Sequence, residues 1–258
     1  MSQKIKRNRI DTCNICKEIK TMTWDHVPPK GGINLSSVEM ESLFLTLVGK
    51  ADNSKSISQN GVKYRTICGD CNSKIGSEFD PVLNQFNRDI ITILQSKLYI
   101  PRYVSVKVKP IRLIKAVLAH ILSAKINTYD NVFDKEVRSL ILYPEVKITE
   151  SIHIFYWIYP YDRTIIMRDF VLLEEPKPVF CNMIKYFPIA FLITNSNNFR
   201  GLDSLSKYRY CELDQEVDLK IDLGFRTEPN WPERNNDSDA IFMSSESLNG
   251  MFAKPKRH

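Results

Sequence analysis

Two Cys-x-x-Cys pairs are the strongest chemical signal in the sequence. Cys13 and Cys16 form the first pair, and Cys68 and Cys71 form the second, far along the chain. Four thiolates in two such pairs can close a tetrahedral site around a zinc ion. We therefore predict one structural Zn²⁺ that holds two distant segments together. The same site would bring the residues between the pairs close to those just after the second pair.

Three residues near the cysteines have side chains suited to catalysis with a divalent ion. Asp25 and His26 lie between the two pairs, and Asn72 directly follows the last cysteine. Carboxylate and amide oxygens suit a hard ion such as Mg²⁺ or Mn²⁺, and a neutral imidazole can take a proton from water. Phosphodiester hydrolysis needs both functions. Successive strand residues point to opposite faces, and Pro28-Pro29 predicts a bend just after the dipeptide.

In this order the residues resemble those of an HNH (ββα-metal) endonuclease with zinc knuckles. The resemblance rests on Cys13-x-x-Cys16, Asp25-His26-Val27-Pro28-Pro29-Lys30 and Cys68-x-x-Cys71-Asn72-x-Lys74, within residues 10 to 80. It implies a small hairpin in which one strand ends at the Asp-His dipeptide, followed by a helix that Asn72 opens. It also implies an enzyme that cleaves nucleic acid.

The resemblance implies a role for each residue of the site. Asp25 and Asn72 would bind the catalytic Mg²⁺ or Mn²⁺ ion, and His26 would be the general base. DNA is the expected substrate, and RNA stays open because these residues contact a phosphate rather than a sugar. Family members commonly carry a further Asn where this chain has Tyr64-Arg65-Thr66-Ile67, so the group that orients His26 is unassigned. Members often belong to bacterial mobile elements or antiviral defence systems.

Each of these residues also has a purely structural interpretation. The cysteines could be four unrelated buried thiols, His26 could cap a turn or bind zinc, and Asn72 could satisfy backbone donors at a helix start. A disulfide framework is not expected, because six cysteines in 258 residues are few for a small secreted scaffold and the N-terminus lacks an apolar signal segment. Cys181 and Cys211 are expected to be ordinary buried thiols.

Composition is compatible with a cytoplasmic protein that binds nucleic acid. The net charge of +6 and the pI near 8.9 are mildly basic. Basic charges can neutralise phosphates and release counterions. No apolar run approaches the ~18 residues that indicate a membrane span. Basic residues crowd the N-terminal end, at Lys4, Lys6, Arg7, Arg9, Lys17 and Lys20.

We expect an α+β fold with two parts. Residues 1–100 would form an HNH-like, zinc-stapled ββα-metal module with a linking helix. Residues 101–258 would form an α+β domain of unassigned role, with helices and an antiparallel β-sheet. A homodimer or a partner protein would bind through this second domain, by an edge of its sheet or by an aromatic hairpin at 152–172.

Hydrophobic periodicity and turn residues predict the individual elements. Helices are expected over 35–48, from Asp80 to about Leu98, and from Pro110 to about Lys125, with His120 as a core residue of the last. Segments 49–61 and 230–243 are expected to be exposed and irregular. Strands are expected at 103–108, at 152–159 and 164–173 as one hairpin, at 179–186 and 189–194 as another pair, and at 217–223 as the last.

Three classes of function are consistent with these features. The first is a metal-dependent endonuclease that uses His26 as its base. The second is a nuclease-derived zinc module that binds nucleic acid or a protein partner without cutting it. The third is an interaction protein that acts through its C-terminal sheet, with zinc knuckles that are purely structural. Asp25, His26 and Asn72 together favour the enzyme.

Overall fold

The computed structural model describes residues 5–33, 36–43, 55–174, 177–224, 241–244 and 250–256. Over these ranges the chain is an α+β protein with four α-helices and antiparallel sheets. The fold class expected from the sequence is confirmed at this level. None of the helices in the described part of the chain is long and apolar enough to cross a membrane.

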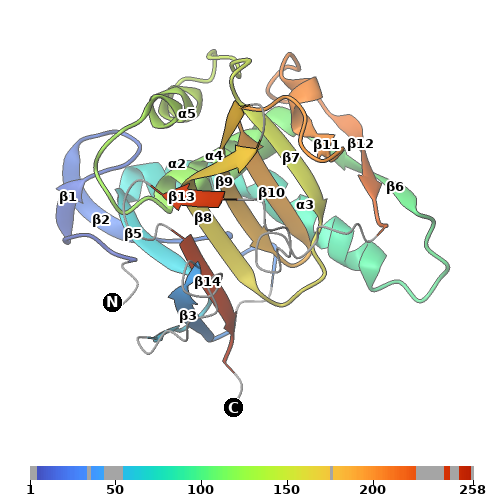
Figure 1. Ribbon diagram of the computed structural model, residues 1–258, viewed down its shortest axis with the longest axis horizontal. Coiled ribbons are helices and arrows are strands. Elements are labelled where there is room, and N and C mark those ends of the chain that lie inside the picture. Colours follow the sequence, from blue (N-terminus) through green and yellow to red (C-terminus); the bar gives the residue numbers. More distant parts are fainter. Residues whose placement is uncertain are drawn as a thin grey trace.

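A three-stranded sheet near the N-terminus carries the cysteine pairs (Figure 1). Its strands are β1 (Ile10–Thr12), β2 (Ile19–His26) and β5 (Lys63–Cys68), in the order β1-β2-β5. Both neighbouring pairs are antiparallel. Helix α2 (Gly69–Glu78) begins directly where β5 ends, so one cysteine pair spans that junction.

Three further helices pack against one another, and the middle one also contacts β5. They are α3 (Asp80–Leu94), α4 (Pro110–Ser123) and α5 (Val132–Leu142). Proline stands in the first turn of α3 and of α4, where its missing N–H costs no helical hydrogen bond. A capping box between Asn131 and Asp134 begins α5. The helices predicted from Asp80 and from Pro110 are therefore confirmed.

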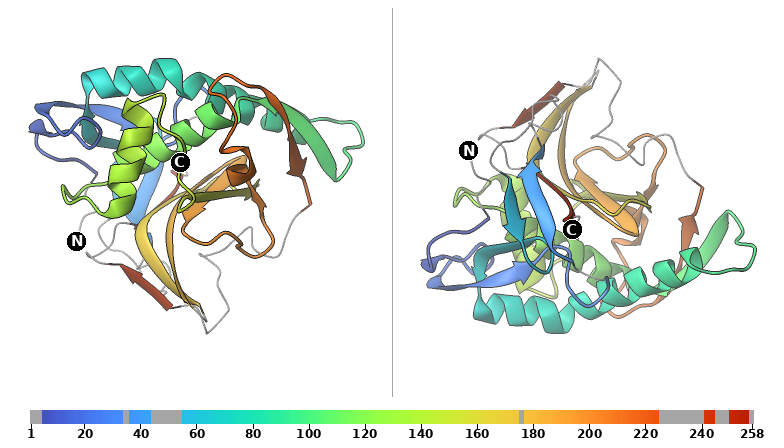
Figure 2. Two further views of the ribbon diagram at one scale, coloured as in Figure 1. Left: turned by 90° about the horizontal axis from the view of Figure 1, so that it is seen from above. Right: turned by 90° about the horizontal axis from the view of Figure 1, so that it is seen from below.

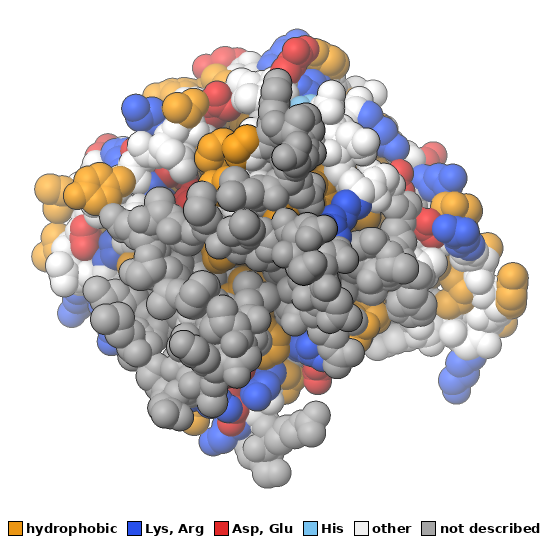
Figure 3. Space-filling model, in the orientation of Figure 1, with side chains coloured by type: hydrophobic (Ala, Val, Ile, Leu, Met, Phe, Trp, Pro, Cys, Tyr) orange, Lys and Arg blue, Asp and Glu red, His pale blue; other side chains and the backbone are white. Residues whose placement is uncertain are grey.

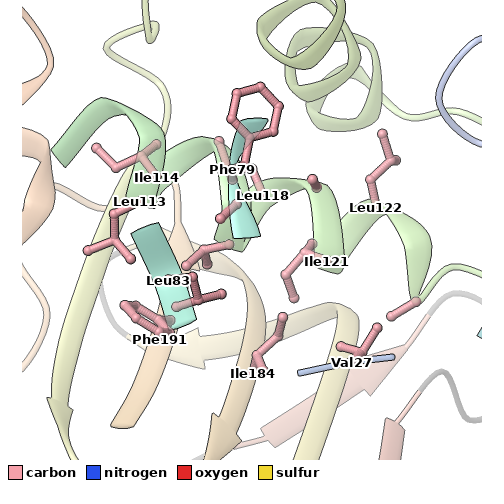
Figure 4. Close-up of a cluster of buried hydrophobic side chains, with 14 of the residues drawn as sticks. Val27, Phe79, Leu83, Leu113, Ile114, Leu118, Ile121, Leu122, Ile184 and Phe191 are labelled. Atoms are coloured by element: carbon pink, nitrogen blue, oxygen red, sulfur yellow. The ribbon is translucent and has the colours of Figure 1, made fainter. Parts of the chain in front are cut away.

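The largest element of the fold is a nine-stranded antiparallel sheet. Its inner strands alternate between two hydrophobic clusters, as strands buried on both faces do. Figure 4 shows the cluster between α4 and this sheet, where Leu113, Leu118 and Ile121 lie near Ile184 and Phe191. The order is β11 (Asp203–Ser204), β7 (His153–Ile158), β10 (Ile189–Thr194), β9 (Lys177–Tyr186), β8 (Thr164–Glu174), β14 (Gly250–Pro255), β3 (Val38–Ser42) and β4 (Ser56–Ser58), and β13 (Ile241–Ser244) also pairs with β8.

A separate two-stranded ribbon joins β6 (Tyr103–Val108) to β12 (Val217–Asp222). Figure 2 shows this ribbon and the adjoining loop reaching away from the body of the molecule. A short 3-10 helix, η1 (Leu205–Tyr208), follows β11. The strand predicted over 103–108 is confirmed. The strand predicted over 217–223 exists as β12, but it is not the last strand, because β13 and β14 follow it in the chain.

The helix predicted over 35–48 is wrong where the structure describes it. Residues 38–42 form strand β3, in which Val38, Met40 and Ser42 are buried while Glu39 and Glu41 are partly exposed. This alternation has a period of two, which fits a strand, and β14 and β4 pair with it on either side. Residues 34–35 and 44–50 lie outside the described ranges. The predicted loop over 49–61 contains β4, and its residues 51–54 also lie outside those ranges.

The predicted hairpin at 152–172 is also wrong, although both of its strands exist. β7 pairs with β10 and β11, while β8 pairs with β9, β13 and β14. Two strands therefore lie between β7 and β8 in the sheet. The predicted pairing of 179–186 with 189–194 is confirmed by the register between β9 and β10. Most of 230–243 lies outside the described ranges, and its last residues belong to β13.

Strands from both sides of residue 100 share the nine-stranded sheet. β3 and β4 come from the first hundred residues, and β14 lies between β3 and β8. The hydrophobic cluster beneath the sheet likewise runs from Cys13 to Ala253.

Candidate metal centre and the residues around it

Local structure brings the two cysteine pairs together. Cys13 and Cys16 lie in the turn between β1 and β2, Cys68 ends β5, and Cys71 lies in the first turn of α2. The turn is closed by backbone hydrogen bonds from Cys13 to Glu18 and from Lys17 to Cys13. Because β2 pairs with both β1 and β5, the turn and the β5–α2 junction meet at one end of the sheet.

The four sulfur atoms lie close enough to hold one metal ion. Each Sγ lies within 4.8 Å of the other three. The Cys16 and Cys68 sulfurs are 3.8 Å apart, which matches the edge of a tetrahedron of about 3.8 Å around zinc with Zn–S bonds of about 2.3 Å. A disulfide would need about 2.05 Å, and all four thiols are free. The predicted cluster is confirmed, and its geometry is compatible with zinc.

Backbone donors around Cys13 favour its thiolate form. The N–H groups of Ile15 and Cys68 donate to the Cys13 sulfur at 3.4 and 3.3 Å. A hydrogen bond from Cys71 lowers the pKa of Cys13, and these backbone bonds add to that effect against the cost of burial. Burial raises the pKa of Cys16 to about 11. Metal binding would therefore release protons from the remaining thiols.

Asp25 points into the protein interior, toward α4. Ser123 Oγ donates to its Oδ2 at 2.5 Å, and His120 Nδ1 donates to the same oxygen at 3.2 Å. The other ring nitrogen of His120 donates to Asp80 Oδ1 at 2.9 Å. Only 1% of the His120 side chain and 5% of the Asp25 side chain are exposed. Residues from β2, α3 and α4 thus form a carboxylate–imidazole–carboxylate cluster that is buried except for the partly exposed Asp80.

His120 is positively charged in this cluster at neutral pH. Burial acts to lower its pKa, but the carboxylates of Asp25 and Asp80 outweigh burial and raise the pKa to about 10. The sequence correctly indicated that His120 is buried in an apolar helix. It gave no signal of the ion pair, because neither carboxylate lies near His120 in the chain.

His26 is half-buried on the opposite face of β2 from Asp25. It pairs with Lys63 of β5, whereas Asp25 pairs with the buried Tyr64. Burial lowers the pKa of His26, and the charges of Lys63, Lys30 and His120 lower it further, against the opposing effect of Asp25. The imidazole is therefore neutral at pH 7 and able to accept a proton.

Asn72 in α2 is anchored to β2 beside Asp25. Its Nδ2 donates to the Trp24 carbonyl at 3.0 Å and to Thr23 Oγ1 at 3.2 Å. The register of β2 against β5 shifts between Thr23 and Trp24. Both amide hydrogens are thus used, and the acceptor oxygen of Asn72 is the atom that remains for a ligand.

The contact between Asn72 and the end of β2 is made to the backbone, and the side chains of Asp25, His26 and Asn72 make no hydrogen bond to one another among the described residues. Asn72 bonds to the carbonyl of the Trp24–Asp25 peptide, so the start of α2 lies against the end of β2. Asp25 and His26 are adjacent but face opposite ways. The following loop is held in place by Arg88 of α3, which donates to the Gly31 carbonyl at 2.8 Å.

The remaining cysteines are separate from this cluster. Cys181 lies in β9 and is fully buried, and Cys211 is partly buried after η1. Among the described residues, the four clustered cysteines are the only group of Cys, His, Asp or Glu side chains placed to hold a metal ion.

Comparisons of this chain with models of protein families, with curated proteins and with solved structures find no match.

Proposed function

We propose that the chain is a metal-dependent phosphodiesterase of the HNH type that cleaves nucleic acid, with DNA as the expected substrate. The observation that carries the proposal is the bond from Asn72 to the Trp24 carbonyl. It sets the first turn of α2 against the strand end that bears Asp25 and His26. A ββα-metal module built from β2, β5 and α2 would have this arrangement, and the sulfur cluster stands beside it.

The proposed chemistry assigns one function to each residue. His26, neutral at pH 7, takes a proton from the attacking water. Asp25 and Asn72 would hold a Mg²⁺ or Mn²⁺ ion, which neutralises charge on the phosphate and the leaving oxygen. Ser123 and His120 already hold one oxygen of Asp25, so the proposal assigns the ion to the other. It also requires the scissile phosphate to lie at the end of β2, within reach of both faces.

The proposed zinc ion has a structural role. The four thiolates would fill a tetrahedral site completely, and a closed site leaves no position for water or substrate. The ion would fix the turn after β1 to the junction of β5 and α2. Those segments also position β2 and Asn72, so the structural ion indirectly holds the catalytic residues in place.

The direct test is a cleavage assay on the purified full chain. Supercoiled plasmid and single-stranded RNA are incubated with Mg²⁺, with Mn²⁺ or with EDTA. We expect cleavage with either metal, none with EDTA, and a loss of roughly a hundredfold or more in His26→Ala. His153→Ala is the matched control, because His153 is a partly buried histidine on the distant strand β7. Equal activity of wild type and His26→Ala would contradict the proposal.

A second candidate function is a zinc module that binds nucleic acid or a protein without cutting. The buried contacts of Asp25 with Ser123 and His120 favour it, because they engage the proposed ion ligand in the interior. Binding of an oligonucleotide by wild type, without cleavage in any of the metals, would support this candidate over the enzyme.

A cellular role in bacterial antiviral defence or in a mobile element would follow from DNA cleavage by an HNH-type enzyme. A homodimer or a protein partner would then contact residues 101–258. Plaque counts on cells that express wild type or His26→Ala test the defence role. Equal plaque counts for the two strains would argue against it.

A further inference from the structure

One face of the small sheet gathers cations around an exposed tryptophan. Trp24 pairs with Arg65 across β2 and β5, and His26 pairs with Lys63. The N-terminal segment runs beside β5, where Lys6 forms a parallel bridge with Arg65. Directly paired residues of neighbouring strands share a face. We call Lys6, Trp24, His26, Lys63 and Arg65 the basic face.

The cations of the basic face have no carboxylate partner among the described residues. Lys63 Nζ and the Arg65 guanidinium lie over the Trp24 ring, 5.5 and 5.4 Å from its centroid. Within the described part of the chain, Lys6, Lys63 and Arg65 form no salt bridge. Arg65 Nη2 donates to the Arg7 carbonyl at 2.8 Å, and its buried Nε has no hydrogen-bond partner among the described residues. By contrast, Lys20 of the same sheet is paired with Glu18 and Asp70.

An open groove continues from the basic face. Lys6, Arg9 and Arg65 line it together with Tyr129, and Asp11 is the acidic residue at its wall. The Tyr129 side chain is 75% exposed and Trp24 is 39% exposed. Figure 3 shows hydrophobic, basic and acidic side chains mixed at the edge of the molecule that carries β1 and β2. Arg65 belongs to both the groove and the basic face, so the two surfaces are continuous.

Exposed aromatic rings among cations match the chemistry of an unpaired nucleic-acid strand. Bases can stack on a protein ring only when they are out of the duplex, and cations along a groove then follow the phosphates. A surface that contacted only the phosphates of a duplex would need the cations but not the exposed aromatic rings of Trp24 and Tyr129. We propose that the basic face and its groove bind a single-stranded segment of DNA or RNA and lead it to His26. Delivery of the strand to His26 rests on the proposed cleavage function, whereas binding of the strand to this surface does not.

The test is a binding measurement that does not depend on cleavage. Fluorescence anisotropy of labelled oligonucleotides, as single-stranded DNA, single-stranded RNA and duplex DNA, is followed without added Mg²⁺ or Mn²⁺. We expect a single strand to bind more tightly than the duplex. Stacking contributes about 1–3 kcal/mol per base, so Trp24→Ala should weaken single-strand binding roughly 5- to 150-fold. Binding should also quench tryptophan fluorescence, and Trp24→Phe should remove that quenching.

Two matched controls separate this surface from exposed side chains in general. Lys63→Ala should reduce the slope of log K against log salt by about 0.7, the value for one phosphate contact with a single strand. Lys20→Ala should leave that slope unchanged, because Lys20 is already paired. Tyr99→Ala removes a ring that is 94% exposed near the distant ribbon and should not change affinity.

The outcomes distinguish the binding surface from the catalytic proposal. Tighter binding to the duplex, or single-strand affinity unchanged in both Trp24→Ala and Lys63→Ala, would overturn the binding surface. Single-strand binding that depends on Trp24 without any cleavage would overturn the catalytic proposal alone and leave the surface in place.

Discussion

At the residue scale, the cysteine cluster could be predicted and the surroundings of Asp25 could not. Two matched Cys-x-x-Cys spacings restrict each pair to a short turn, so four thiols can meet with little further information. The contact of Asp25 with His120 joins residues 95 positions apart. No local pattern signals such a contact, because His120 reads simply as one residue of an apolar helix. The role of Asp25 therefore depends on tertiary packing that sequence periodicity does not contain.

Replacement of one cysteine tests the metal cluster. Cys68→Ser should lose the bound zinc and destabilise the region of residues 10–80, since structural zinc contributes on the order of 10 kcal/mol to small modules. Elemental analysis of protein purified without chelator should give one zinc per wild-type chain and less than one for the variant. Cys211→Ser is the control, because Cys211 lies outside the cluster. Wild-type protein without zinc would refute the prediction.

The lowered pKa of His26 predicts the acidic limb of the pH–rate profile. Burial and the nearby lysines favour the neutral imidazole, which is the form that acts as a base. The rate of cleavage should therefore fall only as pH drops below about 6.5, the ordinary value for histidine. Lys63→Ala removes one of those charges and should move this limb toward higher pH. A limb above pH 6.5 in the wild type would contradict the assignment of His26 as the base.

Asn72 tests whether the two proposed metal sites are distinct. Asn72→Ala should raise the Mg²⁺ concentration needed for half-maximal cleavage about tenfold or more, because an oxygen ligand and the anchor to β2 are lost. Zinc content should stay at one per chain, since zinc would be bound by thiolates instead. Ser73→Ala alters the exposed neighbour in the same helix turn and serves as the control. Loss of zinc in Asn72→Ala would show that the two sites are one.

At the element scale, buried charges fix three elements to one another. Asp25 comes from β2, Asp80 from the first residue of α3 and His120 from α4. The strong helices α3 and α4 were predictable from apolar spacing and from proline in the first turn. Strand β3 was not, because five residues of alternating burial are too few to outweigh the apolar residues that follow. Its strand form depends on pairing with β14, more than 200 positions away in the chain.

Removal of the His120 charge should destabilise the fold and should do so in a pH-dependent way. In His120→Gln the buried Asp25 and the partly exposed Asp80 lose their cation, so the free energy of unfolding at pH 7 should fall by about 3–5 kcal/mol. The folded pKa of about 10 lies above the unfolded value. The stabilisation is therefore complete below about pH 6.5 and lost as pH rises toward 10. In urea denaturation at pH 6.5, 8 and 10, the free energy of unfolding of the wild type should fall toward that of the variant as the pH rises. A constant gap across this range would contradict the charge of His120.

At the scale of the whole molecule, chain order was a poor guide to strand order. Neighbouring strands in a sequence often pair in space, but not always. The rule holds for β9 and β10 and fails for β7 and β8, which are separated by those two strands. The same nonlocal pairing carries β3 and β14 into one sheet with strands from the middle of the chain. Which strands pair over such distances depends on the packing of the complete core, and the local periodicity of a sequence does not contain that information.

The architecture also predicts how the proposed enzyme would act on a duplex. A single site holds one scissile phosphate, so one chain should break one strand in each encounter. Cutting both strands needs two successive events or two chains related by a twofold axis. The described edge strands of the large sheet are β11, β4 and β13, with two, three and four residues. Such short edges offer few backbone groups for pairing with a second copy.

We therefore expect nicked plasmid to accumulate before linear plasmid appears. The rate of nicking should rise in proportion to protein concentration, because one chain suffices for each break. A plasmid time course at several protein concentrations measures both products, and light scattering gives the mass of the protein under the same conditions. Glu212→Ala, a change at an exposed residue far from β2 in the chain, controls for the effects of purification. Direct conversion of supercoiled to linear plasmid by a strict monomer, without a nicked intermediate, would be incompatible with one catalytic site per chain.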